Sequence, residues 1–597
     1  MKSGDQSRAH ILRLMGLGLG LGLVLLFAVA CGASATATPR PTNTAVPVAA
    51  TAVPAAATAV PAAATAVPVV PTSAPVATQV PAATGPTGSL ILATSDWGNE
   101  LFSDHDVRGE GGLYQGLAHD FILQGEGGKK VVPGLATEWS FTPDGLTWTF
   151  VMREGVKYHN GDIMTAEDAA YAMEENLGPR AETESVSPTN ANMSRVTEPW
   201  VVSGPNSISV TTDTPQTFLA FYLSEMFAGP RGTIFQKAYR ESVGRDGYND
   251  DPTPGTTGPW MLEQHDKGSR MLWSRFADYW KLYERNHSYQ NLDMRLIPEL
   301  STRVAALRAG EADLVEANLE VRDQVEDAGG QIIFGPEALY LWFLSEGCWP
   351  DNGTGHALDV PCDKQEFRQA LDYALDKELI AEEIYGGEMA IIEGWAHVTP
   401  ASLGYKPDLD SWPYDVEKAR ELMASIGCAE GSCFPDPYQL YTWEAGELPF
   451  VPEVSQLVCA QWEEAFSINC EVEVGDSVSI KDKMHSFEIA GFFTARPNEA
   501  RFDGGSIMFS GYASPQPTRG MNADLKAVVQ KATELVGTME ERHEAYYQAN
   551  KVAREQHWEW SLFYTNSPWA AGPKVKSWSP SAMVPYASAL WTVELNQ

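Results

Sequence analysis

Short alternating apolar runs and longer helical periods interleave along the chain after residue 88. Strict alternation of apolar and polar residues predicts strands, and apolar residues that recur every third or fourth position predict helices. A chain that mixes the two in this way belongs to the α/β class. The predicted strands are 89–94, 146–151, 207–212 and 487–493, with a further one beginning at Cys470, and the predicted helices are 166–175, 366–385, 415–426, 455–465 and 522–556.

Turn and cap residues separate these elements. Pro143-Asp144-Gly145 lies between two predicted strands, and Asn160-Gly161-Asp162 is a second turn of the same kind. In both turns we expect the glycine to adopt the positive φ that other residues avoid. Thr165 is followed three positions later by Asp168, a spacing that predicts a helix N-cap.

The N-terminal residues have the pattern of an export signal. Three basic side chains precede an uncharged apolar run, 14–30, which small residues and Cys31 close. This ending resembles the lipobox of bacterial lipoproteins, in which the cysteine is lipidated. Cleavage by the ordinary signal peptidase near residues 33–35 is the alternative. We predict a signal peptide at 1–30 and an extracytoplasmic protein, lipid-anchored through Cys31 to the outer face of the cell membrane, or periplasmic.

The segment 31–88 differs from the rest of the chain in composition. Residues 32–88 contain no aromatic or acidic residue, and the sequence TAVP recurs with a period of seven from Thr44. Proline at this density removes backbone donors and fixes φ, so no packed core can form there. We predict a disordered stalk that tethers the folded part within reach of a membrane partner.

The charge of the chain excludes several kinds of partner. Lys and Arg number 42 against 78 Asp and Glu, which gives a formal net charge of -36 over 597 residues. Such a surface repels phosphate backbones and anionic lipid headgroups. We therefore expect no nucleic-acid binding and no electrostatic docking to membranes.

Six cysteines remain besides Cys31, and all lie within one region, 348–470. An even number of cysteines in an exported chain indicates disulfides, although sequence-adjacent pairing is only one of many connectivities. A zinc site is the alternative, but no CxxC pair or suitably spaced histidine supports it. We predict the pairs Cys348–Cys362, Cys428–Cys433 and Cys459–Cys470.

The sequence VVPGLATEWSFTPDGLTWTFVMREGVKYHNGDIMTAEDAAYAME, residues 131–174, looks like the signature of the family 5 extracellular solute-binding proteins, the peptide-binding components of ABC importers. The order of elements in that family continues through residues 255–280, 302–316, 366–388 and 414–427. The resemblance covers residues 89–597.

The resemblance implies a two-lobe periplasmic-binding-protein-like fold, type II, of the large peptide-binding cluster, with an extra inserted subdomain. Two crossing segments join the lobes in such proteins, and the first lobe is discontinuous in sequence. Mapped onto this chain, lobe one takes 89–115, 205–300 and 524–597, the inserted subdomain takes 116–204, and lobe two takes 301–523.

The resemblance also implies a function. The lobes close around a short peptide, and a membrane permease recognises the closed state. An oligosaccharide is the alternative ligand, and a secreted hydrolase is the alternative activity. The sequence contains no GxSxG, HExxH or P-loop motif, so we expect no enzyme, no metal and no cofactor. We expect a monomer.

In peptide-binding members an acidic residue that receives the peptide amine follows a strand of lobe two. The corresponding strand here is predicted at 487–493, and Arg496 stands roughly where that acidic residue is expected. Glu499 or Asp503 could take the acidic role only after a loop rearrangement. If Arg496 points inward, the ligand should carry an acidic or hydroxyl-rich group there; a solvated loop charge is the alternative.

Aromatic side chains supply the remaining candidates for ligand contact. Sugar rings and peptide side chains both stack on aromatic faces in binding clefts. Core packing is the alternative for each tryptophan. The candidates are Trp97, Tyr340, Trp342, Phe343, Trp395 and Phe493.

Overall fold

The computed structural model describes residues 88–98, 100–102, 111–126, 130–178, 195–226, 231–282, 287–349, 360–387, 389–443, 448, 450–514, 519, 522–583 and 587–596. All of them belong to one compact unit, Ala82–Gln597. The predicted signal peptide, Cys31 and nearly all of the predicted stalk lie outside these described residues. Across the described ranges, no helix combines the length and apolar character needed to cross a membrane.

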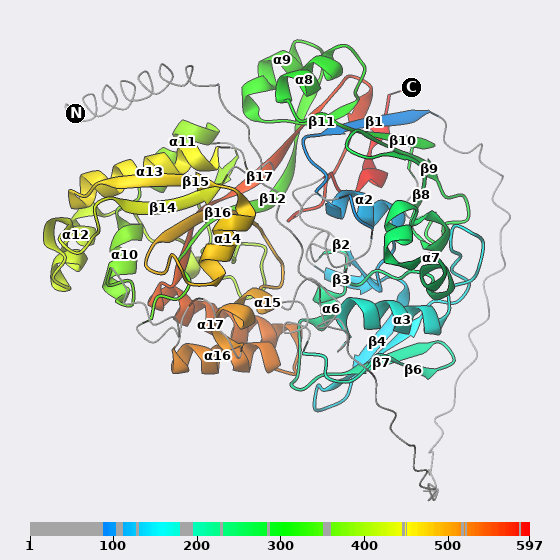
Figure 1. The fold of residues 1–597 in the computed structure, drawn as a ribbon, viewed down its shortest axis with the longest axis horizontal. Helices are drawn as coiled ribbons and strands as arrows, with labels where there is room; N and C mark the ends of the chain where they lie inside the picture. Colours follow the sequence, from blue (N-terminus) through cyan, green and yellow to red (C-terminus); the bar gives the residue numbers. More distant parts are fainter. Residues whose placement is uncertain are drawn as a thin grey trace, which may run out of the picture. The chain divides into compact units, whose positions relative to one another are not determined.

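One large mixed sheet connects distant parts of the chain (Figure 1). The short strand β13 (Ala390–Ile391) pairs with β17 beside the main path of this sheet. The other strands, in spatial order, are β15 (Cys470–Gly475), β14 (Tyr438–Trp443), β16 (Phe493–Glu499), β12 (Gln331–Leu344), β17 (Glu559–Ala571), β11 (Leu314–Glu316), β1 (Ser89–Thr94), β10 (Asn291–Leu296), β9 (Arg270–Arg275) and β8 (Trp260–Asp266).

Three smaller sheets complete the strands of the described residues. A four-stranded antiparallel sheet has the order β4 (Ala136–Phe141), β5 (Thr147–Met152), β7 (Ser207–Thr211) and β6 (Val201–Gly204). The two-stranded sheets are β2 (Leu123–Glu126) with β3 (Lys130–Pro133), and β18 (Val575–Ser577) with β19 (Glu594–Leu595).

The helices differ in length from one turn to five. Helix α13, the second longest, contacts strands β14, β15 and β16 along one side of the large sheet (Figure 1). The α-helices are α2 (Gly111–Ala118), α3 (Ala166–Leu177), α6 (Leu219–Tyr222), α7 (Lys237–Asp250), α8 (Leu300–Arg308), α9 (Arg322–Glu326), α10 (Gln365–Tyr373), α11 (Lys377–Tyr385), α12 (Val416–Ser425), α13 (Val451–Phe466), α14 (Ser477–His485), α15 (Gly505–Met508), α16 (Ala523–Glu534) and α17 (Met539–Gln556).

Local sequence signals locate many of these elements. The predicted strand 89–94 is β1, and Thr165 and Asp168 form the predicted capping box of α3. The two predicted turns also exist, with Gly145 at φ +73° between β4 and β5 and Gly161 at φ +92°.

Three predicted elements are wrong. The helix predicted at 366–385 is two helices, because the Asp376 side chain accepts a hydrogen bond from the Leu379 amide (3.0 Å) and starts α11. The helix predicted at 522–556 is also divided, because Thr538 starts α17 with a capping box of its own. The strand predicted at 487–493 is a turn that contains Phe487 at φ +61°, and the actual strand is β16.

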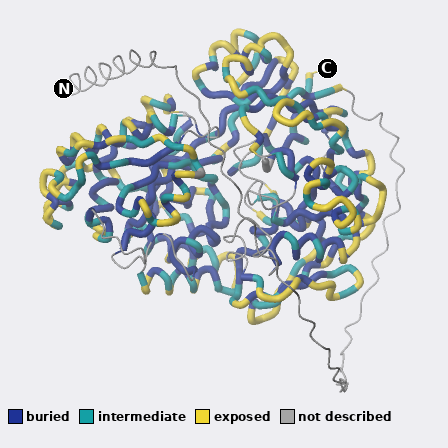
Figure 2. Tube along the Cα trace, in the orientation of Figure 1, coloured by how far each residue is buried: buried dark blue, intermediate teal, exposed yellow. Residues whose placement is uncertain are grey.

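Two large apolar clusters make up most of the hydrophobic interior. Figure 2 marks all buried residues, polar and apolar, in dark blue. The first core contains buried residues between Leu90 and Leu314 and between Trp569 and Val593. The second core contains buried residues between Ala338 and Phe563. Strands β12 and β17 pair with each other along most of their length and extend from one core into the other.

The grouping of core residues differs from the predicted lobe boundaries in two places. Helices α16 and α17, predicted in lobe one, pack in the second core. Helices α8 and α9, predicted in lobe two, pack against Ala93 of β1 and Ala570 of β17. In both cases the tertiary packing decides which core a helix joins, and the sequence order of the elements does not show this. The lobe boundaries themselves stay a prediction.

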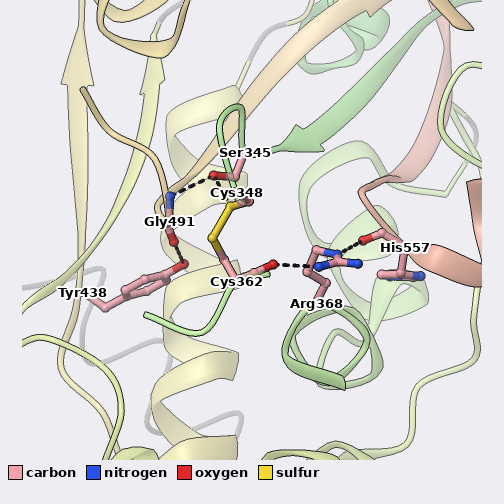
Figure 3. The surroundings of a disulfide bond; sticks show 7 residues. All are labelled: Ser345, Cys348, Cys362, Arg368, Tyr438, Gly491 and His557. Atoms are coloured by element: carbon pink, nitrogen blue, oxygen red, sulfur yellow. Dashed lines mark hydrogen bonds between the residues drawn. A yellow bond between two sulfur atoms is a disulfide. The ribbon is translucent and has the colours of Figure 1, made fainter. Parts of the chain in front are cut away.

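All three predicted disulfides are present, at Cys348–Cys362, Cys428–Cys433 and Cys459–Cys470. Figure 3 shows how the first lies beside a buried arginine. Arg368 donates hydrogen bonds to the carbonyl oxygens of Cys362 (2.7 Å) and His557 (2.9 Å). The cysteines are therefore structural cross-links, which agrees with an oxidising compartment and sets the zinc alternative aside.

Candidate functional site

The part of the large sheet formed by β14, β16, β12 and β17 has two chemically different faces. Successive side chains of a strand point to opposite faces, so the register decides which residues share one. Trp342 of β12 lies opposite Arg496 of β16, and Tyr340 lies opposite Asn498. Tyr441 of β14 lies opposite Thr494 in the same way. These side chains share one face, which we call the polar face.

The opposite face packs against helices. Phe343 stacks on Trp560 with ring centroids 5.8 Å apart, and Phe493 lies 4.7 Å from the same ring. Phe343 also contacts the ring of Trp462 from α13. Both predicted residues are fully buried in the second core. The structure thus gives Phe343 and Phe493 a packing role, and a part in ligand binding stays a prediction for them.

Two further predicted tryptophans lie in the interior. Trp395 is buried in the second core and Trp97 in the first. Within the described residues neither indole N–H has a hydrogen-bond partner. Core packing, the alternative considered for each tryptophan, accounts for their burial, while a ligand contact for either stays a prediction.

The structure brings the predicted residues Tyr340, Trp342 and Arg496 together on the polar face. The Arg496 guanidinium carbon lies 4.6 Å from the Trp342 ring centroid, which is a cation–π distance. Arg519, which the sequence did not single out, lies 4.3 Å from the same ring. Asn498 donates a hydrogen bond of 2.7 Å to the Tyr340 hydroxyl. The Arg496 side chain thus lies over the Trp342 ring on the polar face.

Two buried carboxylates lie near these arginines, and each has its own partners. Glu559 accepts a hydrogen bond of 2.6 Å from Tyr512 and lies 3.4 Å from Arg519 Nε. Burial alone raises the pKa of Glu559, but Arg519 and His397 outweigh it and bring the pKa to about 2. Glu559 is therefore charged at neutral pH.

Glu346 lies two residues after the end of β12 and is almost completely buried. Its carboxylate lies 2.8 Å from His485 Nδ1. Burial raises the pKa of Glu346, yet the nearby His485, Arg519 and Arg496 lower it overall. The polar face therefore contains a buried charge network in which the carboxylates are ionised.

Asp503, the remaining predicted residue, lies in a different environment. Its carboxylate forms an ion pair of 2.7 Å with Arg542. Both residues line a cavity of about 550 Å³ whose apolar wall includes Trp139, Trp148 and Phe221. Asp503 is thus a carboxylate at the wall of a cavity, and its ion-pair partner is Arg542.

Phe502, the neighbour of Asp503, contacts both cores. It packs against the first core, the second core and the aromatic cluster of Tyr340 and Trp342. It also lines both the cavity beside Asp503 and a second one of about 150 Å³ next to Trp260. Among the described residues that line these cavities, Phe502 is the one that packs against both cores.

The sequence missed Arg519, Glu559 and Glu346. Each is a single charged residue in a segment without a recognisable motif, so no local signal marks it. A signal did exist in β16, where Thr494, Arg496 and Asn498 alternate with Phe493 and Ala495. The wrong placement of the strand at 487–493 concealed this alternation.

Comparison with known proteins identifies the class. The family model of the bacterial extracellular solute-binding proteins, family 5, middle region, matches residues 130–515 of this chain. Since this is more than half of the chain, the protein belongs to that family of extracellular solute-binding receptors.

Relatives with known names support the same class. The chain is 24% identical to heme-binding protein A of Haemophilus influenzae over 467 residues, which are 72% of this chain and 78% of the relative. It is 26% identical to the dipeptide-binding protein of Escherichia coli over 321 residues, which are 51% of this chain and 56% of the relative.

A solved structure shows the same fold. The periplasmic binding protein DppA of Helicobacter pylori, in complex with the peptide STSA, has a TM-score of 0.69 and 20% sequence identity, and the match covers 86% of this chain and 99% of that one. The predicted α/β fold of the two-lobe periplasmic binding proteins is therefore confirmed.

Proposed function

We propose that this protein is the substrate-binding component of an ABC importer, which captures a short peptide between two lobes and delivers it to a permease in the cytoplasmic membrane. The family match supports the receptor role, and the dipeptide-binding relative and the peptide complex of the similar structure favour a peptide. In this proposal the protein acts as a monomer, as a binder rather than an enzyme, and without a cofactor.

The observation that carries the closure mechanism is the path of β12 and β17 between the two cores. Their register breaks between Gly335 and Leu339, and Glu337 in this gap has φ +49°. The Glu337 amide donates to the Asn566 side chain of β17 (3.0 Å). A local break in the register of two strands that connect the lobes can act as a hinge and absorb the rotation of one lobe against the other.

We expect the ligand to be identified by mass spectrometry of solute that co-purifies with the protein. A ligand that binds only the folded state stabilises it by RT ln(1 + [L]/Kd), about 2.7 kcal/mol at 100 times Kd. A thermal-shift screen with mixed di- to pentapeptides should therefore raise the melting temperature, with cello- and xylo-oligosaccharides as controls. A response to the oligosaccharides alone would contradict the peptide proposal.

We further propose that the mature protein begins at Cys31, which is lipidated, and that residues 31–88 tether the receptor to the membrane. The support is the sequence pattern around Cys31 and the Pro-rich composition that follows it. Metabolic labelling with a palmitate analogue should label the wild type and leave Cys31→Ala unlabelled. Equal label in both proteins would exclude this anchor.

A further inference from the structure

Within the described residues, Arg496 has no carboxylate at ion-pair distance, although the charges of Glu346 and Glu559 act on it from farther away. Its side chain is only partly exposed, and it stands directly opposite Trp342 in the register of β16 and β12. Among the described residues its Nε atom is buried without a hydrogen-bond partner, and no carboxylate forms an ion pair with its guanidinium. Burial lowers the pKa of Arg496, the sign of a guanidinium removed from water. Such a group gains free energy when an anion reaches it.

The nearby carboxylates do not serve as that anion, because other groups hold them. Glu346 pairs with His485 at 2.8 Å. Glu559 is held by Tyr512 and Arg519, at 2.6 Å and 3.4 Å. Arg519 itself has a further acceptor in the Ile507 carbonyl oxygen (2.9 Å). Because Glu346, Glu559 and Arg519 have partners within the protein, Arg496 is the cation of this network that can bind an anionic group of a ligand.

Two more donors lie on the same face and lack an acceptor. Trp342 and Thr494 are 1% and 0% exposed, and neither the indole Nε1 nor the hydroxyl Oγ1 has a hydrogen-bond partner among the described residues. Thr494 lies two positions before Arg496, so both side chains point to the same face of β16. Unpaired buried polar groups are costly and rare in proteins, and a bound ligand is one way to satisfy them.

The chemistry of these donors selects the ligand group. An ionised carboxylate only accepts hydrogen bonds, and its two oxygens offer about four lone-pair sites. A planar guanidinium can bind it through two parallel hydrogen bonds. An ammonium group, in contrast, carries only donors and would meet a positive charge here. The three donors therefore match a carboxylate and reject an amine.

We propose that the polar face around Arg496, Trp342 and Thr494 is a carboxylate subsite, so that the substrates are peptides or peptide-like solutes recognised through a free carboxylate rather than through an amine. This inference rests on the proposed function and specifies its substrate class.

The ligand-side test uses the full-length protein and one mixed tripeptide library in three forms: unmodified, amidated at the C-terminus and acetylated at the N-terminus. Competition binding and thermal shift should show that amidation weakens binding on the order of 10- to 100-fold, the usual loss for one charge-assisted hydrogen-bonded pair. Acetylation should change it little.

The outcomes of this test separate the two proposals. Equal binding of the unmodified and amidated libraries, or loss of binding on acetylation, overturns the carboxylate subsite and leaves peptide binding intact. If none of the three forms binds, the proposed function fails, and the inference fails with it.

The protein-side test is Arg496→Gln. This variant should bind the unmodified library more weakly by a similar factor and bind the amidated library as the wild type does, because the lost interaction needs both Arg496 and the ligand carboxylate. Arg496→Lys should retain part of the affinity, since the charge stays while the planar fork is lost. Arg308→Gln, a change of an exposed arginine at the end of α8, serves as the control with unchanged binding.

Circular dichroism melting of the unliganded variants shows whether each is folded. If Arg496→Gln is folded and keeps the wild-type preference for the free carboxylate, the assignment of Arg496 is wrong.

Discussion

Replacement of Asp372 by Asn is expected to lower the free energy of unfolding by about 3–5 kcal/mol, the usual cost of removing one partner of a buried ion pair. The Asp372 carboxylate lies 2.7 Å from Lys377 Nζ and 3.1 Å from His557 Nε2. All three side chains are at most 4% exposed. The Asn variant leaves the Lys377 charge buried without its counter-ion, and this uncompensated charge is the source of the loss.

Urea unfolding at pH 7 measures this effect. Glu544→Gln is the control, because Glu544 forms its ion pair of 2.8 Å with Lys406 at the surface, where both side chains are about half exposed. Such a pair contributes little to stability, because both charges remain in water and two long side chains must be held in one geometry. If the two substitutions cost the same small amount, the buried network around Asp372 does not stabilise the second core.

Acid is expected to lower the free energy of unfolding by roughly 3 kcal/mol in total through protonation of Glu559. The pKa of Glu559 is about 2 in the folded protein, against an ordinary value of 4.5. Below pH 4.5 the Glu559 carboxylate binds a proton in the unfolded chain but stays ionised in the folded protein. The stabilisation by Glu559 is therefore fully present above pH 4.5 and is lost as the pH falls through about 2.

A comparison of wild type with Glu559→Gln isolates this contribution, since other carboxylates titrate in the same range. Between pH 5 and pH 3 the wild type should lose roughly 2 kcal/mol more unfolding free energy than the variant. At pH 7 the variant should already be less stable, because Arg519 loses its carboxylate partner.

Glu594→Gln is the matched control, since Glu594 pairs with Lys576 at an exposed site. Parallel pH curves for wild type and Glu559→Gln would show that the Glu559 carboxylate is not held in its ionised form by the fold.

The elements that the sequence predicted well depend on local physics. The capping box of Thr165 and Asp168 closes within four residues, and the turn at Gly145 needs only a residue that tolerates positive φ. The cysteine pairs also lie close together in the chain, with separations of 5 to 14 residues. In each case the partners find each other with little chain between them.

The same local reasoning failed where two signals competed. Residues 366–385 have one continuous helical period, but Asp376 begins a new helix because its side chain bonds to the Leu379 amide. Residues 487–493 alternate like a strand, but they form a turn before β16. Asp and similar short polar residues offer the backbone a local partner that periodicity does not reveal.

By itself the sequence predicted the α/β class, the family and the three disulfide pairs. It placed the strand near Arg496 wrongly, because Arg496 lies within β16 and not after a strand at 487–493. Only the tertiary structure decided what Arg496 does. Its position opposite Trp342 follows from the register between β16 and β12, whose paired residues are at least 150 positions apart. The partners that occupy Glu346 and Glu559 come from still other segments. A charge becomes available or is neutralised according to its neighbours in space, and packing of the whole chain sets those neighbours.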